Sequence, residues 1–241
     1  MTFKLTYSTM FNPPEEMHAR FEAAVAATRA SLGATHPLYI DGAEVAGVGT
    51  IVNHSPIDGA LLGHFATADA TVVKQAVDAA ARAYPAWRAC APAERVRLSH
   101  RVADLIDERV YDLAAALALE VGKNRLEALA EAAEVADFFR GYADEYERSG
   151  YYDRVLPDDP LTDWRSHNRS VLKPHGVWAV VAPFNFPLMV PLWMGPLALG
   201  TGNAFSLKPS EQTPVSAIEL ARMLKMSGLP AGLFSVVHCD R

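Results

Sequence analysis

The last third of the chain alternates short apolar runs with helical segments, and this alternation limits the possible folds most strongly. Val177 to Ala182 is a continuous apolar run rich in β-branched residues, as expected for a parallel strand buried on both faces. Further strands are predicted at 204–207 and 234–237, with helices over 187–200 and 214–226 and Thr213 as the cap of the second helix. Strands joined by helical crossovers predict an α/β fold with a parallel sheet.

The first 149 residues predict helices and a small sheet. Helices are expected over 15–33, 69–84, from about 92, 112–121 and 125–148, with Pro85 ending the second of them. Extended pieces at 38–40, 51–53 and 61–65, near Asp-Gly turns, predict a small antiparallel sheet. The polar segment 150–173 predicts a loop or hairpin, so the chain divides into units 1–149, 150–173 and 174–241.

The chain stops at Arg241, directly after the third parallel strand. A doubly wound sheet needs further strands to cover the edge that this strand leaves. We therefore expect an incomplete sheet with apolar surface open beside Val237, and a chain that aggregates or oligomerises when isolated.

Composition excludes several classes of function. Acidic residues (28) outnumber basic residues (22), and this balance argues against a nucleic-acid or anionic-membrane partner. No apolar run approaches the length of about 18 residues that a membrane span requires. The two cysteines, Cys90 and Cys239, are too few for a disulfide framework or a cysteine zinc cluster, which favours a cytoplasmic location. The histidines do not cluster at metal-ligand spacing, so we expect no metal, and surface or capping roles for His238 and the others.

Two polar segments follow the first two parallel strands, where ligands bind in open α/β folds. The first, 181–187, carries Asn185 between two prolines, an amide donor suited to an oxyanion. The second, 208–214, carries Lys208 and Glu211, which suit the hydroxyls of a ribose. Each has a simpler interpretation: Asn185 as a helix cap, and Lys208 with Glu211 as a surface ion pair. Glu127, Glu131 and Glu134 are interpreted as a solvated helix face.

Together these segments resemble the aldehyde dehydrogenase superfamily over almost the whole chain. The resemblance rests on Pro-Phe-Asn-Phe-Pro at 183–187, Gly-Thr-Gly-Asn at 200–203, Ser-Leu-Lys-Pro-Ser-Glu-Gln-Thr-Pro at 206–214 and Gly-Leu-Pro-Ala-Gly at 228–232. Upstream, Trp87 and Glu120-Val121-Gly122-Lys123 agree with it. The N-terminal stretch around His36-Pro37-Leu38-Tyr39-Ile40-Asp41-Gly42 is most similar to 1-pyrroline-5-carboxylate dehydrogenases, which oxidise glutamate γ-semialdehyde.

The resemblance implies an aldehyde-dehydrogenase-like fold, with N-terminal helices and a small sheet beside an incomplete Rossmann-like sheet. It makes Asn185 the side-chain donor of the oxyanion hole, and it places the adenosine ribose of NAD (or NADP) on Lys208 and Glu211. Ser210 would bear on the choice between NAD and NADP, and residues 150–173 would be the first part of an oligomerisation hairpin in a homo-oligomer. The residues implied to line the cofactor channel are Val181, Ala182, Pro183 and Phe184.

The same resemblance implies that the nucleophilic cysteine and the general-base glutamate lie downstream of Arg241. Cys90 and Cys239 do not match the catalytic position. We therefore expect the N-terminal portion of an aldehyde dehydrogenase that is inactive as this chain alone. The alternative is a non-catalytic module that binds nucleotide weakly or associates with a full-length relative.

Overall fold

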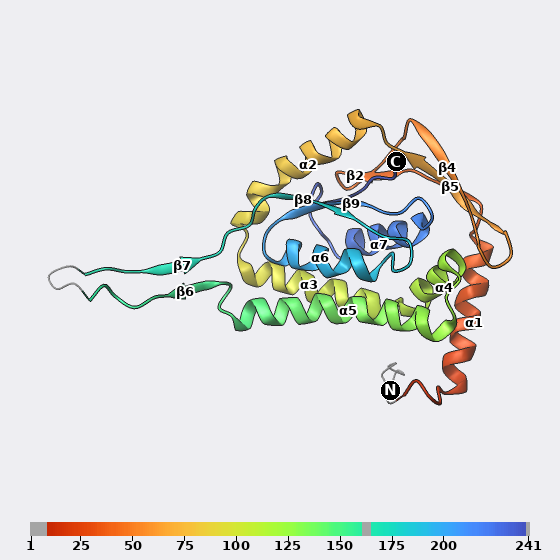
Figure 1. Cartoon of the computed structure of the whole chain (residues 1–241), viewed down its shortest axis with the longest axis horizontal. Helices are drawn as coiled ribbons and strands as arrows, with labels where there is room; N and C mark the ends of the chain where they lie inside the picture. Colours follow the sequence, from red (N-terminus) through yellow and green to blue (C-terminus); the bar gives the residue numbers. More distant parts are fainter. Residues whose placement is uncertain (1–8, 161–164, 240–241) are drawn as a thin grey trace.

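A five-stranded mixed sheet forms the centre of this computed structural model, which describes residues 9–160 and 165–239. The strand order is β3-β2-β10-β9-β8. Helix α2 (Ala70–Ala89) covers one face, while α6 (Met189–Gly200) and α7 (Pro214–Met226) cover the other. Helices α3 (Pro92–Glu108) and α5 (Arg125–Arg148) pack as a further layer against α6 (Figure 1).

The parallel part of this sheet confirms the predicted strand–helix alternation. It consists of β8 (Val177–Val181), β9 (Ala204–Lys208) and β10 (Phe234–Val236), with α6 and α7 as the crossovers. In β9 and β10, Phe205, Leu207, Phe234 and Val236 are almost completely buried. This arrangement is the expected α/β fold, and it brings the carboxyl ends of the three strands to one edge.

The prediction of an open edge beside Val237 is wrong. Strand β2 (Leu38–Ile40) pairs antiparallel with β10, and β3 (Ala43–Val45) pairs with β2, so two strands cover that side. Leu38 and Ile40 are buried against Val237 and α2, which gives β2 a hydrophobic reason to join this sheet. Within the described residues, the outer strand on the opposite side is β8, whose Val181 side chain is 65% exposed.

The predicted small sheet is correct only in part. Strands β4 (Gly49–His54) and β5 (Leu61–Thr67) are antiparallel as expected, but their third partner is β1 (Ala34–His36), parallel to β5. Residues 38–40 belong to the central sheet instead. Pro37, which lacks a backbone N–H, separates β1 from β2, and the two short strands enter different sheets.

The N-terminal helices include α1 (Glu15–Ala30) and α4 (Val110–Val121), and Pro85 does not end α2 as predicted. The helix continues through Pro85 to Ala89 and thereby places Trp87 in the core. The Trp87 indole N–H donates to the Leu199 carbonyl at 2.9 Å, and Arg95 Nε donates to the Gly200 carbonyl at 3.0 Å. Both acceptors are carbonyl groups in the last turn of α6, which has no partners for them within the helix. The helix continues past Pro85 because burial and hydrogen bonding of Trp87 stabilise it by more than the loss of one backbone hydrogen bond costs.

Residues 150–160 and 165–173 leave the body of the molecule as the two arms of a ribbon (Figure 1). Strands β6 (Asp153–Val155) and β7 (Arg169–Val171) pair antiparallel, and Arg169 forms an ion pair with Asp153. Residues 161–164 of the predicted hairpin and Arg241 lie outside the described residues. The hairpin itself is present, while its role in oligomerisation and the domain limits stay predictions. No helix in the described part of the chain is long and apolar enough to cross a membrane.

Helix α6 approaches the sheet closely at Gly195, and this contact generates a test of the packing. A Cβ at Gly195 would lie 2.7 Å from Cζ of Phe205, a completely buried ring. We expect Gly195→Ala to lower the free energy of unfolding by about 1–3 kcal/mol, because the ring has nowhere to move.

Gly141 in α5 is the matched control, because a Cβ there meets nothing within 4 Å. Gly141→Ala should raise the free energy of unfolding by about 0.5–1 kcal/mol through helix propensity alone. Urea unfolding followed by circular dichroism measures both. Equal effects of the two substitutions would contradict the close packing of α6 on β9.

Candidate functional site

The two polar segments predicted from the sequence lie next to each other at the carboxyl edge of the sheet. The Ala182 amide, at the start of the loop after β8, donates to the Lys208 carbonyl at the end of β9, at 3.0 Å. The Val237 amide after β10 donates to the Leu207 carbonyl, also at 3.0 Å. The ends of all three parallel strands therefore meet, as expected for a ligand site in an open α/β fold.

The loop after β8 presents Asn185 to solvent. Asn185 is exposed and Phe184 is 55% exposed, whereas Ala182 belongs to the hydrophobic core. Asn185 is not a helix cap: α6 begins with Leu188 at its N-cap and has no side-chain hydrogen bond from that residue. The simpler of the two interpretations of Asn185 is thus excluded, and its amide is accessible at the site.

The start of α6 is bound by Glu131, which the sequence analysis placed on a solvated face. That interpretation is correct for Glu127 and Glu134, which are exposed, but wrong for Glu131, whose side chain is only 1% exposed. Its Oε1 accepts hydrogen bonds from the amides of Leu188 and Met189, both at 3.1 Å. Its Oε2 pairs with Nζ of Lys123. A carboxylate suits this position because the N-terminus of a helix carries unsatisfied N–H groups and a partial positive charge.

The loop after β9 places Lys208 and Glu211 at the same edge. Their side chains are 3.7 Å apart, Nζ to Oε2, and are one quarter and one third exposed. Ser210 is buried, and its hydroxyl oxygen accepts the Gln212 amide at 3.2 Å. Asn53 of β4, which the sequence analysis did not select, donates from Nδ2 to the carbonyls of Glu211 (3.2 Å) and Gln212 (3.0 Å).

A second buried carboxylate, Glu120, binds the N-terminus of α7. It accepts the amides of Val215 and Ser216, the latter at 3.1 Å. Thr213, the predicted cap, occupies the N-cap position but makes no capping hydrogen bond. Burial raises the pKa of the Glu120 carboxyl to about 8, against the lowering effect of the amide hydrogen bonds. The one sequence signal that points to Glu120 is its place in the motif 120–123.

His238 follows β10 and is buried rather than exposed, so its predicted surface role is wrong. It is only 1% exposed and its ring packs edge-on to Phe65, and among the described residues neither ring nitrogen has a hydrogen-bond partner. Burial lowers the pKa of His238 to about 4, and the charges of His36 and Lys208 lower it further. The His238 imidazole is therefore neutral at neutral pH.

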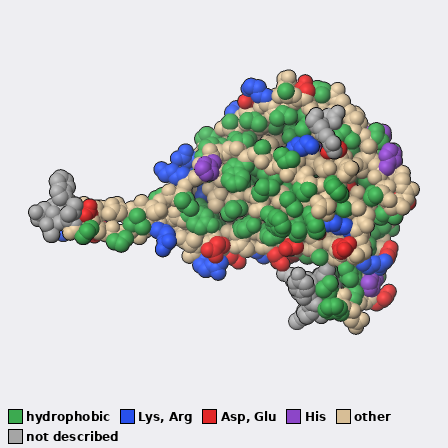
Figure 2. Space-filling view, viewed as in Figure 1, with side chains coloured by type: hydrophobic (Ala, Val, Ile, Leu, Met, Phe, Trp, Pro, Cys, Tyr) green, Lys and Arg blue, Asp and Glu red, His purple; other side chains and the backbone are tan. Residues whose placement is uncertain are grey.

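Hydrophobic side chains cover much of the face toward the viewer in Figure 2. Exposed large apolar residues are present on β8, the following loop and α6: Val181, Phe184, Phe186 and Trp193. A contiguous exposed apolar surface next to a polar edge is typical of a ligand or docking surface.

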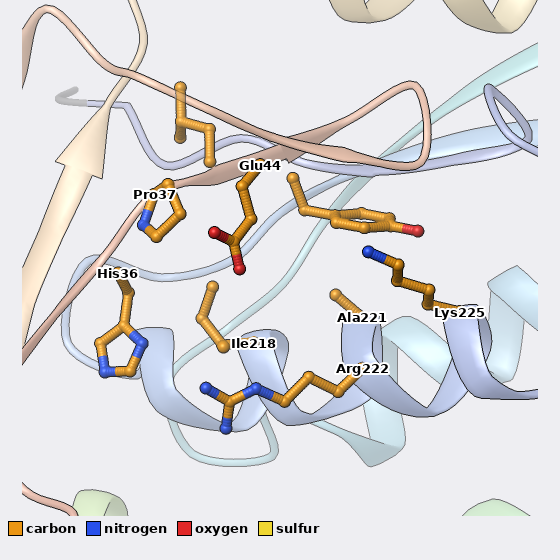
Figure 3. A pocket seen from close by; sticks show the side chains of 9 residues that line it. His36, Pro37, Glu44, Ile218, Ala221, Arg222 and Lys225 are labelled. Carbon is orange, nitrogen blue, oxygen red and sulfur yellow. The ribbon is translucent and has the colours of Figure 1, made fainter.

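A separate hollow of about 130 Å³ lies between the β2–β3 hairpin and α7 (Figure 3). Leu38, Ile218 and Ala221 line its apolar part, and the charged side chains of Glu44 and Arg222 reach over it. None of the predicted site residues lines this hollow. Among the described residues, no group of three or more histidine, cysteine, aspartate or glutamate side chains is placed to hold a metal ion.

Comparison with known proteins identifies the family of the chain. Residues 44–241 match the aldehyde dehydrogenase family. The chain belongs to that family. It is 35% identical over 213 residues to malonate-semialdehyde dehydrogenase of Pseudomonas aeruginosa, covering 87% of this chain and 41% of that protein. It is 32% identical over 225 residues to 1-pyrroline-5-carboxylate dehydrogenase of Bacillus pumilus, covering 92% and 42%.

Solved structures agree with this assignment. A 1-pyrroline-5-carboxylate dehydrogenase from Thermus with bound NAD superposes with a TM-score of 0.87 at 28% identity. The superposition covers all of this chain and 46% of that one. This aldehyde dehydrogenase chain thus spans about two fifths of the length of the curated relatives it matches, and the predicted aldehyde-dehydrogenase-like fold is confirmed.

The buried His238 predicts that the stability of this aldehyde dehydrogenase chain depends on pH. The folded-state pKa of about 4 lies below the unfolded value of 6.5, so between these values only the unfolded chain binds the proton. The free energy of unfolding should therefore fall as the pH falls from 6.5 towards 4, by up to about 3 kcal/mol from this group. His238→Leu should remove that dependence.

Urea unfolding at a series of pH values measures the effect as the difference between parent and variant profiles, which cancels contributions from other groups. His175→Leu, at an exposed histidine, is the matched control and should leave the profile unchanged. Parallel profiles for the parent and His238→Leu would rule out a buried neutral His238.

Proposed function

We propose that this chain provides the cofactor edge and the oxyanion donor of an NAD-dependent aldehyde dehydrogenase that converts an aldehyde to a carboxylic acid. The observation that supports this most is the meeting of two loops at one sheet edge, one with Asn185 and the other with Lys208 and Glu211. An acid–base pair and a neutral amide at a strand edge match the needs of a ribose and of a developing oxyanion, respectively.

The residues at this edge fit a dinucleotide. Lys208 donates and Glu211 accepts, so the pair matches the two adjacent hydroxyls of a ribose, and both side chains remain partly accessible. The exposed Val181 and Phe184 offer apolar surface beside them. When bound, NAD would supply the acceptor for the hydride that leaves the substrate carbon. The buried Ser210 hydroxyl is engaged within its own turn, which supports NAD over NADP.

The part of Asn185 in this proposal is electrostatic. Attack on an aldehyde carbonyl moves negative charge onto its oxygen, and a fixed amide N–H directed at that oxygen stabilises the charge. Loss of one such donor typically lowers the rate by about 10²–10³-fold. Pro183 and Pro187 on either side of the loop limit its backbone freedom, which keeps the donor in place.

Cofactor binding tests the proposal on this chain. Lys208→Ala and Glu211→Ala should each weaken NAD binding by about tenfold, because each removes the partner of one ribose hydroxyl. Isothermal titration calorimetry, or ligand-observed NMR if binding is weak, measures the affinity. Lys225→Ala, at an exposed lysine near the end of α7, is the control and should not change it. Binding that is unaffected by both site variants would refute the assignment.

For the substrate we propose glutamate γ-semialdehyde. Its support is the superposition of the whole chain on 1-pyrroline-5-carboxylate dehydrogenases at TM-scores of 0.87 and the similarity of residues 36–42 to that group. The 35% identity to a malonate-semialdehyde dehydrogenase makes malonate semialdehyde the main competitor.

A panel of aldehydes distinguishes these substrates. Protein purified from the cells that make it should reduce NAD fastest with glutamate γ-semialdehyde, measured as kcat/KM at 340 nm. Malonate semialdehyde and betaine aldehyde serve as comparison substrates. A higher kcat/KM for either would displace the proposed substrate. No turnover with all three, together with measurable NAD binding, would favour the non-catalytic module.

A further inference from the structure

The loop that carries Asn185 is bound at its far end by a side chain from α5. Glu131 accepts the amides of Leu188 and Met189 with a single oxygen, Oε1. This leaves Oε2 for another partner, and that partner is the Lys123 ammonium group. The Glu131 side chain is 1% exposed and that of Lys123 is 10% exposed, so water screens this ion pair little.

The same ammonium group also contacts the loop one residue after Asn185. Nζ of Lys123 lies 3.7 Å from the centroid of the Phe186 ring, over its face. Phe186 itself is 38% exposed, so burial of the ring does not fix it by itself. A cation so close to an aromatic face is attracted by the ring quadrupole, more strongly where the cation has lost its water.

Glu120, the buried carboxyl group in the last turn of α4, offers a contrast. Glu120 binds the start of α7 in the same manner, but within the described residues it forms no ion pair. At this second site a carboxyl group binds a helix N-terminus without a paired lysine, and it is largely protonated at neutral pH because burial raises its pKa to about 8. Binding of a helix N-terminus by a carboxyl group therefore does not by itself require a lysine. Beyond its ion pair with Glu131, Lys123 contributes the contact with Phe186.

We propose that Lys123 and Glu131 are positioning residues for Asn185: the ion pair fixes Phe186 through the ammonium group and residues 188–189 through the carboxylate. Asn185 is adjacent to the first of these contacts, and Pro187 lies between the two. The orientation of its amide is therefore set before any substrate arrives, which is what an oxyanion donor needs. The catalytic meaning of this inference rests on the function proposed above; the ordering of the loop does not.

The test uses ¹⁵N relaxation of the Asn185 backbone amide in this chain labelled with ¹⁵N-asparagine, with the signal assigned by its loss in Asn185→Asp. In the parent, the order parameter should be that of rigid backbone, about 0.85. Phe186→Leu keeps both the ion pair and the helix cap but removes the aromatic face. It should lower the Asn185 order parameter below about 0.6 while the melting temperature stays close to that of the parent.

Phe184→Leu is the matched control, because it makes the same change on the other side of Asn185, at a ring that is 55% exposed. It should leave the Asn185 order parameter at the parent value. The double variant Lys123→Met/Glu131→Gln supplies a second test, since it replaces the ion pair by two neutral side chains and leaves an amide oxygen to accept from residues 188–189. It should mobilise Asn185 as Phe186→Leu does.

The outcomes separate the two proposals. A flexible Asn185 in the parent, or an order parameter unchanged in Phe186→Leu, overturns the positioning role whatever the enzyme does. Equal losses in Phe186→Leu and Phe184→Leu overturn it as well. In the aldehyde assay, Phe186→Leu should lower kcat about tenfold or more with an unchanged KM for NAD. A mobile Asn185 with unchanged kcat would leave the positioning intact and refute the oxyanion role of Asn185.

Discussion

Both crossover helices depend on side chains from the N-terminal helices for hydrogen bonds at their ends. Glu131 and Glu120 accept the first amides of α6 and α7. At the opposite ends, Trp87 donates to the Leu199 carbonyl of α6, and Arg101 donates to the Ser227 carbonyl after α7 at 3.3 Å. Helix ends that are buried without partners would be strongly destabilising, so these contacts join the first half of the chain to the parallel sheet.

These contacts at the helix ends also hold the loops at the sheet edge, so the polar side chains on those loops have defined positions. The loop after β8 leads directly into the amides bound by Glu131, and the loop after β9 leads into those bound by Glu120. Asn53 adds two hydrogen bonds to the second loop from another sheet. Asn185, Lys208 and Glu211 therefore project from short segments whose far ends are fixed, an arrangement that favours preorganised binding.

The local features of the fold could be predicted from sequence, and the long-range partners could not. Helix α5 has the predicted bounds because Asn124 caps it and Gly122 ends the helix before it. The prediction that α2 ends at Pro85 failed because a proline indicates a helix end only from its local sequence. The burial of Trp87 depends on α6, more than a hundred residues away. The prediction of a solvated Glu131 failed for the same reason. Glutamates repeated at helical spacing are typical of a solvated face, and the partner that buries this one lies far along the chain. The candidate site residues could be named because motif order, unlike burial, can be read along the chain; their roles stay predictions.

The distance along the chain between the buried carboxylates and their partners has a consequence for synthesis. Glu120 precedes Val215 by 95 residues, and Glu131 precedes Leu188 by 57. At a ribosomal rate of about 5–20 residues per second, roughly 5–20 s pass between the emergence of Glu120 and that of the amides it binds. During that time α4 and α5 exist with two carboxylates that have no helix end to bind. On the nascent chain these two groups therefore stay in water, and α4 and α5 can bury them only once the first turns of α6 and α7 have been made.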